Sequence, residues 1–212
     1  MNIIDLTHTL TSTSPVYPGD APMLLSKIAD YTAHGYNNSE IRTGMHVGTH
    51  IDGPLHMLEH ADTIDKLPLA KLTGEAIVFN VTEQTELILS AEIRSAHIAN
   101  KIVLLRSDFS NRYYQPGYYT DHPVLSEELA DYLVLQGIKM LGIDFPSPDR
   151  APYAVHPKLF AQGIPIIENL TNLSLLAGYR QIDIIALPLK IEADSAPARV
   201  IAIVDNNLKH KG

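Results

Sequence analysis

The chain contains, at residues 46–56, the sequence His46-Val47-Gly48-Thr49-His50-Ile51-Asp52-Gly53-Pro54-Leu55-His56. Three imidazoles and one carboxylate lie in this stretch, all at even positions. Side chains of an extended strand alternate between its two faces. The spacing therefore predicts that His46, His50, Asp52 and His56 project from one face of a strand. Neutral imidazole and carboxylate are together ligands for divalent zinc, manganese or iron, so the stretch predicts a metal site.

Two other interpretations of this stretch are a helical pair of histidines and a solvent-facing strand. Histidines four residues apart also occur on helices, as in zinc proteases, but Gly48, Gly53 and Pro54 disfavour a helix interior. The stretch could also be a solvent-facing strand that happens to be rich in histidine, since the chain has 10 histidines. The grouping of four metal-capable groups among small and apolar residues favours the metal site.

The composition is that of an ordinary globular protein. A length of 212 residues is typical of one domain with a substantial core, and we expect a single domain over residues 1–212. The hydrophobic fraction of 45% and the charged fraction of 19% argue against disorder. The net charge is −8 and the chain has no basic tract, which argues against a nucleic-acid partner. No apolar run is long enough to span a bilayer, so no membrane partner is expected.

The absence of cysteine narrows the chemistry further. It excludes disulfides, thiolate nucleophiles and zinc sites built from cysteine. The first residues have neither the basic region nor the long apolar core of a signal peptide. Together these features predict a cytoplasmic location. The sequence also has no Gly-x-Ser-x-Gly elbow, Walker-type phosphate loop or Gly-x-Gly-x-x-Gly fingerprint.

Short runs rich in Ile and Val predict the strands. They are residues 3–6, 23–29, 39–52, 76–81, 102–106, 140–143, 165–168, 182–187 and 200–204. Helices are predicted around residues 91–99, from the capping Ser126 to Gly137, and from Pro157 to near Gly163. This order predicts an α/β fold with a mixed sheet and flanking helices. The tyrosine-rich stretch 113–123 is a predicted loop, long enough to cover a site.

Two distant residues are candidates to complete the metal site. His156 precedes Pro157 at the predicted helix entrance, and Glu168 ends an apolar strand. A carboxylate buried there would be costly without a cation. Each residue also has an ordinary alternative, because His156 could flank a helix at the surface and Glu168 could mark a solvated strand end.

Residues 46–56 resemble the His-x-Gly-Thr-His-x-Asp-x-Pro-x-His signature of the cyclase superfamily of metal-dependent hydrolases. Within that superfamily the chain is most similar to the bacterial kynurenine formamidases, or arylformamidases. Residues 5–7 resemble the family's opening strand, residues 15–20 its substrate-contacting loop, and residues 144–149 its Asp-x-Pro-Ser segment. His156 and Glu168 follow at the expected distances, so the likeness covers nearly the whole chain.

The resemblance implies a swivelling β/β/α-type fold and a site for two divalent metal ions, with zinc preferred over manganese. By position, His46, His50 and Asp52 would hold the first ion. Asp52 would also reach the second ion, which His156 would bind, and Glu168 would serve one or both ions.

The resemblance also implies the activity. It is hydrolysis of a small amide, above all an aryl formamide such as N-formylkynurenine, by hydroxide that the metal generates. His56 would be the acid–base group, and Tyr17, where formamidases commonly have Trp, would contact the substrate. A homo-oligomer is expected. Alternatives left open are a cyclic amide or lactone hydrolase like isatin hydrolase, a cyclase-type lyase, and an inactive metal-binding protein.

Overall fold

The computed structural model describes residues 1–205, and its main feature is one eight-stranded sheet. The strand order is β1 (Asn2–Asp5), β12 (Ser195–Val204), β11 (Ile182–Pro188), β5 (Thr73–Asn80), β7 (Ile102–Arg106), β9 (Met140–Ile143), β10 (Ile166–Glu168) and β4 (His50–Asp52). Because β4 also pairs with β12, the sheet closes into a barrel-like arrangement.

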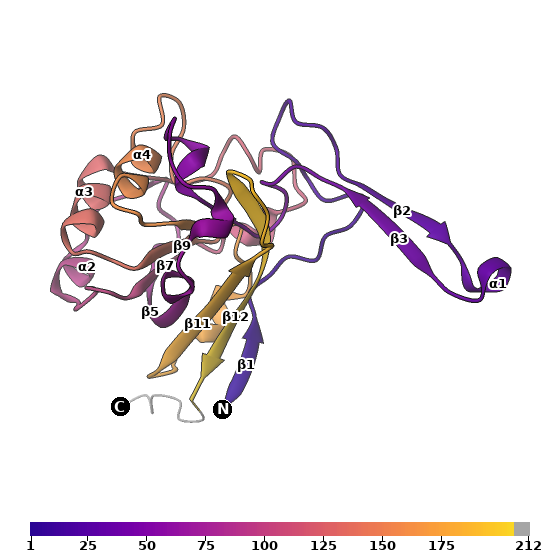
Figure 1. The fold of residues 1–212 in the computed structure, drawn as a ribbon. Helices are drawn as coiled ribbons and strands as arrows, with labels where there is room; N and C mark the ends of the chain where they lie inside the picture. The colour runs from indigo at the N-terminus through magenta and orange to yellow at the C-terminus, as the bar shows by residue number, and fades with distance from the viewer. Residues whose placement is uncertain (206–212) are drawn as a thin grey trace.

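Helices connect the parallel strands of this sheet. The pairs β5–β7, β7–β9 and β9–β10 are parallel, and the other pairs of the sheet are antiparallel. Parallel neighbours need crossover connections, which contain α2 (Ala91–Ser95), α3 (Glu127–Leu135) and α4 (Val155–Phe160). The three helices lie together on one side of the sheet (Figure 1). The predicted α/β class, with a mixed sheet and flanking helices, is confirmed.

The sheet separates two hydrophobic cores, because alternate side chains along a strand point to its two faces. In β7, Ile102 and Leu104 belong to the core between the strands, whereas Val103 and Leu105 pack in the core that includes the helices. In β4, Ile51 lies in the first of these cores. Its neighbours His50 and Asp52 therefore leave the sheet on the opposite, helix-bearing face.

Smaller elements surround the sheet. An antiparallel ribbon of β2 (Leu24–Ala29) and β3 (Asn38–Arg42), with α1 (Tyr31–His34) at its tip, projects from the body as an arm (Figure 1). A short parallel pair joins β6 (Glu86–Leu87) to β8 (Val124–Leu125). The 3-10 helices are Pro54–His56, Ile64–Lys66, Leu69–Lys71, Phe109–Arg112 and Leu173–Leu176. Of the helices within residues 1–205, none combines the length and apolar character needed to cross a membrane.

The predicted single strand over residues 39–52 is wrong. The backbone makes β3, turns, and then makes β4, and Gly48 within the turn has φ of 68°. That conformation suits glycine and ends an extended strand. His46 therefore lies in the turn, and His56 ends the 3-10 helix that begins at Pro54. Only His50 and Asp52 share a face by strand alternation.

Helix ends and one strand also differ from prediction. The Ser126 side chain caps α3 as predicted, accepting from the backbone N–H of Leu129. However, α4 begins at Val155, two residues before Pro157, and α2 ends at Ser95. Strand β12 begins at Ser195, five residues before the predicted start. The single domain over residues 1–212 stays a prediction, and residues 206–212 lie outside the described part of the chain.

Candidate metal centre

Three buried polar side chains meet where β4 pairs with β10. His50 lies directly opposite Glu168 in the antiparallel register, and Asp52 lies opposite Ile166. Residues opposite each other project on the same face, so His50, Asp52 and Glu168 gather on the helix-bearing face. Their exposed fractions are 1%, 0% and 4%. The sheet register thus groups one imidazole and two carboxylates away from solvent.

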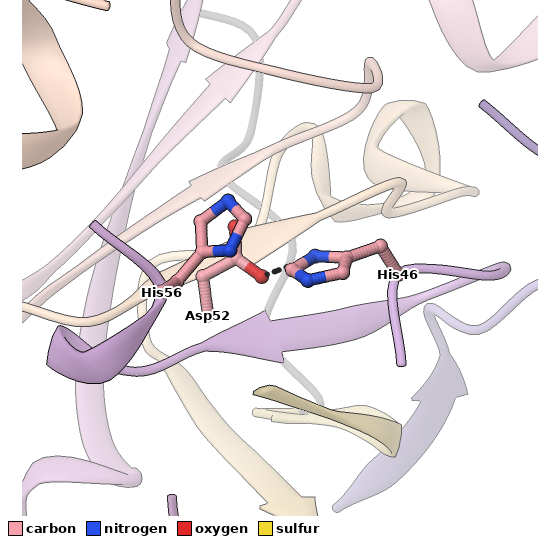
Figure 2. A group of neighbouring side chains, drawn as sticks. All are labelled: His46, Asp52 and His56. Atoms are coloured by element: carbon pink, nitrogen blue, oxygen red, sulfur yellow. Dashed lines mark ion pairs between the residues drawn. The ribbon is translucent and has the colours of Figure 1, made fainter. Parts of the chain in front are cut away.

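Two further imidazoles approach from the turns on either side of β4. His46 Nδ1 is 3.0 Å from Asp52 Oδ1 and 3.2 Å from His50 Nε2. The rings of His46 and His56 lie on either side of the Asp52 carboxylate (Figure 2). One ligand atom from each of His46, Asp52 and His56 lies within 4.8 Å of the others. Asp52 is therefore shared, because His50, Asp52 and Glu168 form a second such group.

His156 reaches the same centre from the first turn of α4. Its Nε2 is 3.6 Å from Asp52 Oδ2 and 3.4 Å from Glu168 Oε1. The other oxygen of Glu168, Oε2, is 3.3 Å from His50 Nε2. The structure thus brings together all six residues that the sequence places in the metal and acid–base machinery: His46, His50, Asp52, His56, His156 and Glu168.

The hydrogen bonds of two histidines show which ring nitrogens face the centre. His50 Nδ1 is 2.8 Å from the Gly48 carbonyl oxygen, and His156 Nδ1 is 2.6 Å from Asp149 Oδ1. Both partners are acceptors, so Nδ1 carries the proton and Nε2 presents a lone pair in each neutral ring. Both lone pairs then point at the carboxylate oxygens of Asp52 and Glu168. Such an arrangement is repulsive unless a positive charge lies between the groups.

The same atoms lack hydrogen-bond partners. Both oxygens of Asp52, Oε1 of Glu168 and Nε2 of His156 are buried and unpartnered. Burying a carboxylate without a partner is costly, whereas divalent cations bind imidazole nitrogen and carboxylate oxygen directly. The residues present therefore fit a divalent metal ion.

The pKa shifts agree with a site that favours positive charge. Burial lowers the pKa of His50, but the carboxylates of Asp52 and Glu168 outweigh burial and raise the pKa to about 10. Burial also lowers the pKa of His156, but the neighbouring carboxylates of Asp149, Asp52 and Glu168 outweigh burial and raise the pKa well above its usual value. Burial raises the pKa of Asp52, yet the surrounding imidazoles bring it well below its usual range. Either a proton or a metal ion can supply the positive charge that these buried carboxylates favour.

Two carboxylates that sequence reasoning left without a role support these histidines. Asp149 accepts the backbone N–H groups of Val155 and His156 as well as the His156 ring. Because this distant cap satisfies the first N–H groups of α4, the helix begins before Pro157. Asp194 Oδ2 is 2.9 Å from His46 Nε2 and 3.5 Å from His56 Nδ1. Asp149 lies within segment 144–149, and the resemblance of that segment to the family could have identified it as a site residue. No sequence signal marks Asp194.

A cavity of about 250 Å³ opens beside the centre. His46, His56, His156 and Glu168 line it, and so does Tyr17. The remaining lining residues are Asp20, Met57, Tyr119, Pro146, Ser147 and Tyr153. The Tyr17 ring, 46% exposed, meets the Tyr119 ring edge-on with centroids 5.7 Å apart. The cavity therefore gives a small molecule access to both the metal-capable groups and an aromatic surface.

Comparison with known proteins defines the class. Residues 4–150 match the family model described as "Putative cyclase". The chain belongs to this family, and it is an enzyme of the metal-dependent hydrolase class. The family resemblance found in the sequence is confirmed.

Individual relatives are similar over almost their whole length. The kynurenine formamidase of Bordetella avium (strain 197N) is 30% identical over 206 residues, which cover 93% of this chain and 95% of the relative. That of Bacillus cytotoxicus is 28% identical over 205 residues, with the same coverage. Among solved structures, isatin hydrolase A from Labrenzia aggregata bound to benzyl benzoate has a TM-score of 0.83 and 26% identity, covering 95% of this chain and 93% of that one. A potential metal-dependent hydrolase with cyclase activity has a TM-score of 0.80 and 29% identity, covering 95% and 96%.

Proposed function

We propose that this metal-dependent hydrolase is an amidohydrolase that cleaves an aryl formamide, such as N-formylkynurenine, to an arylamine and formate. The observation that carries the proposal is a pair of metal-capable groups that share the buried Asp52, placed beside a cavity that Tyr17 and two other tyrosines line. The kynurenine formamidases that are 28–30% identical over 93% of the chain support this choice of substrate.

We assign two divalent ions to the centre, with Zn²⁺ preferred over Mn²⁺. His46, His50 and Asp52 would hold the first ion, because their facing atoms lie 3.0–3.2 Å apart. Asp52, His156 and Glu168 would hold the second, since their unpartnered buried atoms face one another. When bound, such ions lower the pKa of water and polarise a carbonyl oxygen.

His56 is the proposed acid–base group. In the reaction, the oxygen of water bonds to the formyl carbon, the C–N bond breaks, and the amine leaves with one proton gained. His56 lines the cavity, and burial lowers its pKa, which keeps the ring neutral near pH 7. A neutral imidazole can take the proton from water and pass it to the amine.

Tyr17 is the proposed substrate contact. Its ring lines the cavity and packs edge-on against the Tyr119 ring. Two tyrosines that brace each other can present a flat surface to an aromatic ring at low entropic cost.

A substrate panel tests the proposal. Zinc-loaded and manganese-loaded protein should be assayed on N-formylkynurenine, isatin and simple aryl esters, with chelated protein as the control. The proposal expects metal-dependent turnover with N-formylkynurenine as the preferred substrate. Preferred turnover of isatin would favour the cyclic-amide alternative, which the structural similarity to isatin hydrolase A supports. Metal binding with no turnover of any substrate would favour an inactive metal-binding protein.

We also propose that the protein is a homodimer. Residues of the β2–β3 arm expose large apolar side chains at 46–70%, namely Leu24, Leu25, Ile28, Tyr31, Tyr36 and Ile41. A two-stranded ribbon is at best marginally stable alone in water. The body presents Leu69, Leu187 and Leu189, also exposed, around a cavity of about 210 Å³. Leu189 and Ile41 share a second cavity of about 300 Å³, so the apolar surface runs from the arm onto the body.

A second copy fits this surface because each chain has both the projecting apolar arm and the apolar cavities on its body. In a two-fold dimer the arm of each chain could pack against the body of the other, since such an interface is self-complementary. Light scattering should give a dimer mass for wild type and a monomer mass for Leu25→Glu. Leu135→Glu, at a residue 79% exposed on α3, is the matched control and should remain dimeric. A wild-type monomer would contradict the proposal.

The cysteine-free composition favours a reducing compartment, and a cytoplasmic location stays a prediction.

A further inference from the structure

Asp194 places one carboxylate oxygen between two histidines that have different proposed roles. Its Oδ2 lies 2.9 Å from Nε2 of His46, a proposed ligand, and 3.5 Å from Nδ1 of His56, the proposed acid–base group. The two imidazole rings are themselves close, with centroids 4.3 Å apart. One carboxylate is therefore within reach of both sides of the centre.

The backbone holds Asp194 in this position from both directions. The residue immediately precedes β12, whose first residue, Ser195, pairs with Asp52. The Asp194 carbonyl oxygen accepts from the Gly53 N–H at 3.0 Å, and the preceding carbonyl accepts from the Ile64 N–H at 2.8 Å. A Cβ atom on Gly53 would lie only 2.9 Å from the Asp194 carbonyl oxygen. Glycine at position 53 thus permits the close approach that brings the carboxylate to the centre.

The contact with His46 determines which nitrogen of that ring faces the other ligands. Asp194 can only accept there, so His46 carries its proton on Nε2 and donates it. The Nδ1 lone pair is then left facing His50 Nε2 and Asp52 Oδ1. Carboxylates that orient metal-binding histidines in this way typically contribute 10- to 100-fold in metal affinity or activity.

The contact with His56 has the same polarity. The separation of 3.5 Å is long for a hydrogen bond from a neutral ring, but catalytic hydrogen bonds often tighten only when substrate is bound. If Nδ1–H of His56 points at Asp194, Nε2 is the nitrogen left to exchange a proton in the cavity.

We propose that Asp194 is a shared positioning residue, which orients His46 toward the metal and His56 toward the substrate. The first role requires only that the centre binds metal, and the second rests on the proposed function. The two roles are separable by experiment because they predict different measurements.

Metal affinity tests the first role. Zn²⁺ dissociation constants from chelator competition should rise roughly 10- to 100-fold in Asp194→Asn. Glu192→Gln is the matched control, because Glu192 is exposed in the same segment and loses the same charge. It should bind as wild type does. Unchanged Zn²⁺ affinity in Asp194→Asn would overturn the first role. This readout needs no turnover, so it stands even if the protein hydrolyses none of the proposed substrates.

Turnover at saturating Zn²⁺ tests the second role. With metal restored, kcat of Asp194→Asn should remain roughly 10- to 100-fold below wild type, with KM changed less than about threefold, because the substrate surface is intact. In a His56→Ala background the same substitution should have no further effect on kcat. A kcat that recovers fully with Zn²⁺, or an additive effect in that background, would overturn the link to His56.

NMR spectroscopy tests the link between Asp194 and His56 even if the protein hydrolyses none of the proposed substrates. Long-range ¹H–¹⁵N spectra of zinc-loaded protein should show the His56 proton on Nδ1 in wild type and in Glu192→Gln. In Asp194→Asn the ring should become a mixture of tautomers, since the acceptor charge is gone. An unchanged His56 tautomer in Asp194→Asn would contradict the proposal.

Discussion

Replacing Asp52 by asparagine removes the one carboxylate that both ligand groups share, with almost no change in side-chain size. In the wild type, its two oxygens face His46 and His50 on one side and His156 on the other, at 3.0–3.6 Å. Both oxygens are buried and have no hydrogen-bond partner. We therefore expect Asp52→Asn to weaken binding of both metal ions.

The size of the effect follows from burial. Removing one partner of a buried ion pair costs about 3–5 kcal/mol, and about 1.4 kcal/mol is tenfold in affinity, so Zn²⁺ binding should weaken roughly 10²- to 10⁴-fold. At a free Zn²⁺ concentration of about 100 times its dissociation constant, the wild type gains about 2.7 kcal/mol of stability from each bound ion. For a chain of 212 residues, this raises Tm by about 5–11 °C. At the same concentration Asp52→Asn gains less than about 0.4 kcal/mol, or under about 2 °C.

Thermal unfolding with and without Zn²⁺ measures this difference, and elemental analysis counts the ions. The wild type should hold up to two ions per chain and lose them to a chelator. Asp62→Asn is the control, because Asp62 is exposed and undergoes the same chemical change. For each protein, the Tm without Zn²⁺ is subtracted from the Tm with Zn²⁺. This difference excludes any effect that the substitution has on the stability of the metal-free protein. A rise in Asp52→Asn within about 2 °C of wild type, or retention of two ions, would refute the shared-ligand assignment.

Three further predictions concern separate parts of the molecule. His56→Ala should keep both ions but lose kcat by roughly 10²- to 10⁴-fold, as for a lost acid–base group; metal loss as complete as in Asp52→Asn would make His56 a ligand instead. Tyr17→Ala should raise KM for aromatic substrates roughly tenfold, matching about 1.4 kcal/mol of ring contact, and Tyr17→Trp should keep or improve turnover. Unchanged KM for both would place Tyr17 away from the substrate. Burial of His8, which stacks on Tyr113, lowers its pKa from 6.5 to about 4. The unfolded chain therefore takes up this proton first, and stability should fall as pH drops from 6.5 toward 4, by about 1–3 kcal/mol after allowing for partial exposure. His8→Phe should flatten that part of a denaturation-versus-pH curve, and an unchanged slope would contradict the reasoning.

Sequence patterns predicted the elements whose residues are buried on both faces. The run at residues 102–106 became β7, and that at 140–143 became β9, because short, largely apolar runs favour buried parallel strands. The start of β12 was missed, since residues 195–199 read Ser-Ala-Pro-Ala-Arg, which have low strand propensity. These residues are extended because they pair with β4 and β11. Tertiary pairing outweighed local preference there.

The spacing of histidines predicted a group of residues that the structure does bring together, but the predicted geometry was partly wrong. An extended strand was predicted to carry all four polar groups of residues 46–56, but Gly48 turns the chain, and Pro54 begins a 3-10 helix. Two turns, rather than strand alternation, bring His46 and His56 toward Asp52. A period of two cannot be distinguished from such turns in sequence, because both return side chains to one side over a few residues.

The sequence by itself determined the donor chemistry and the family, because ligand types and the spacing of residues 46–56 are local properties of the chain. Only the tertiary structure decided how the centre closes. The β4–β10 register sets Glu168 against His50, and closure of the sheet through β12 brings Asp194 beside His46. Hydrogen-bond register between distant strands is a cooperative property of the whole sheet, and no local pattern encodes it. The same holds for Asp149, whose carboxylate caps α4 and orients His156 only once the intervening loop has folded.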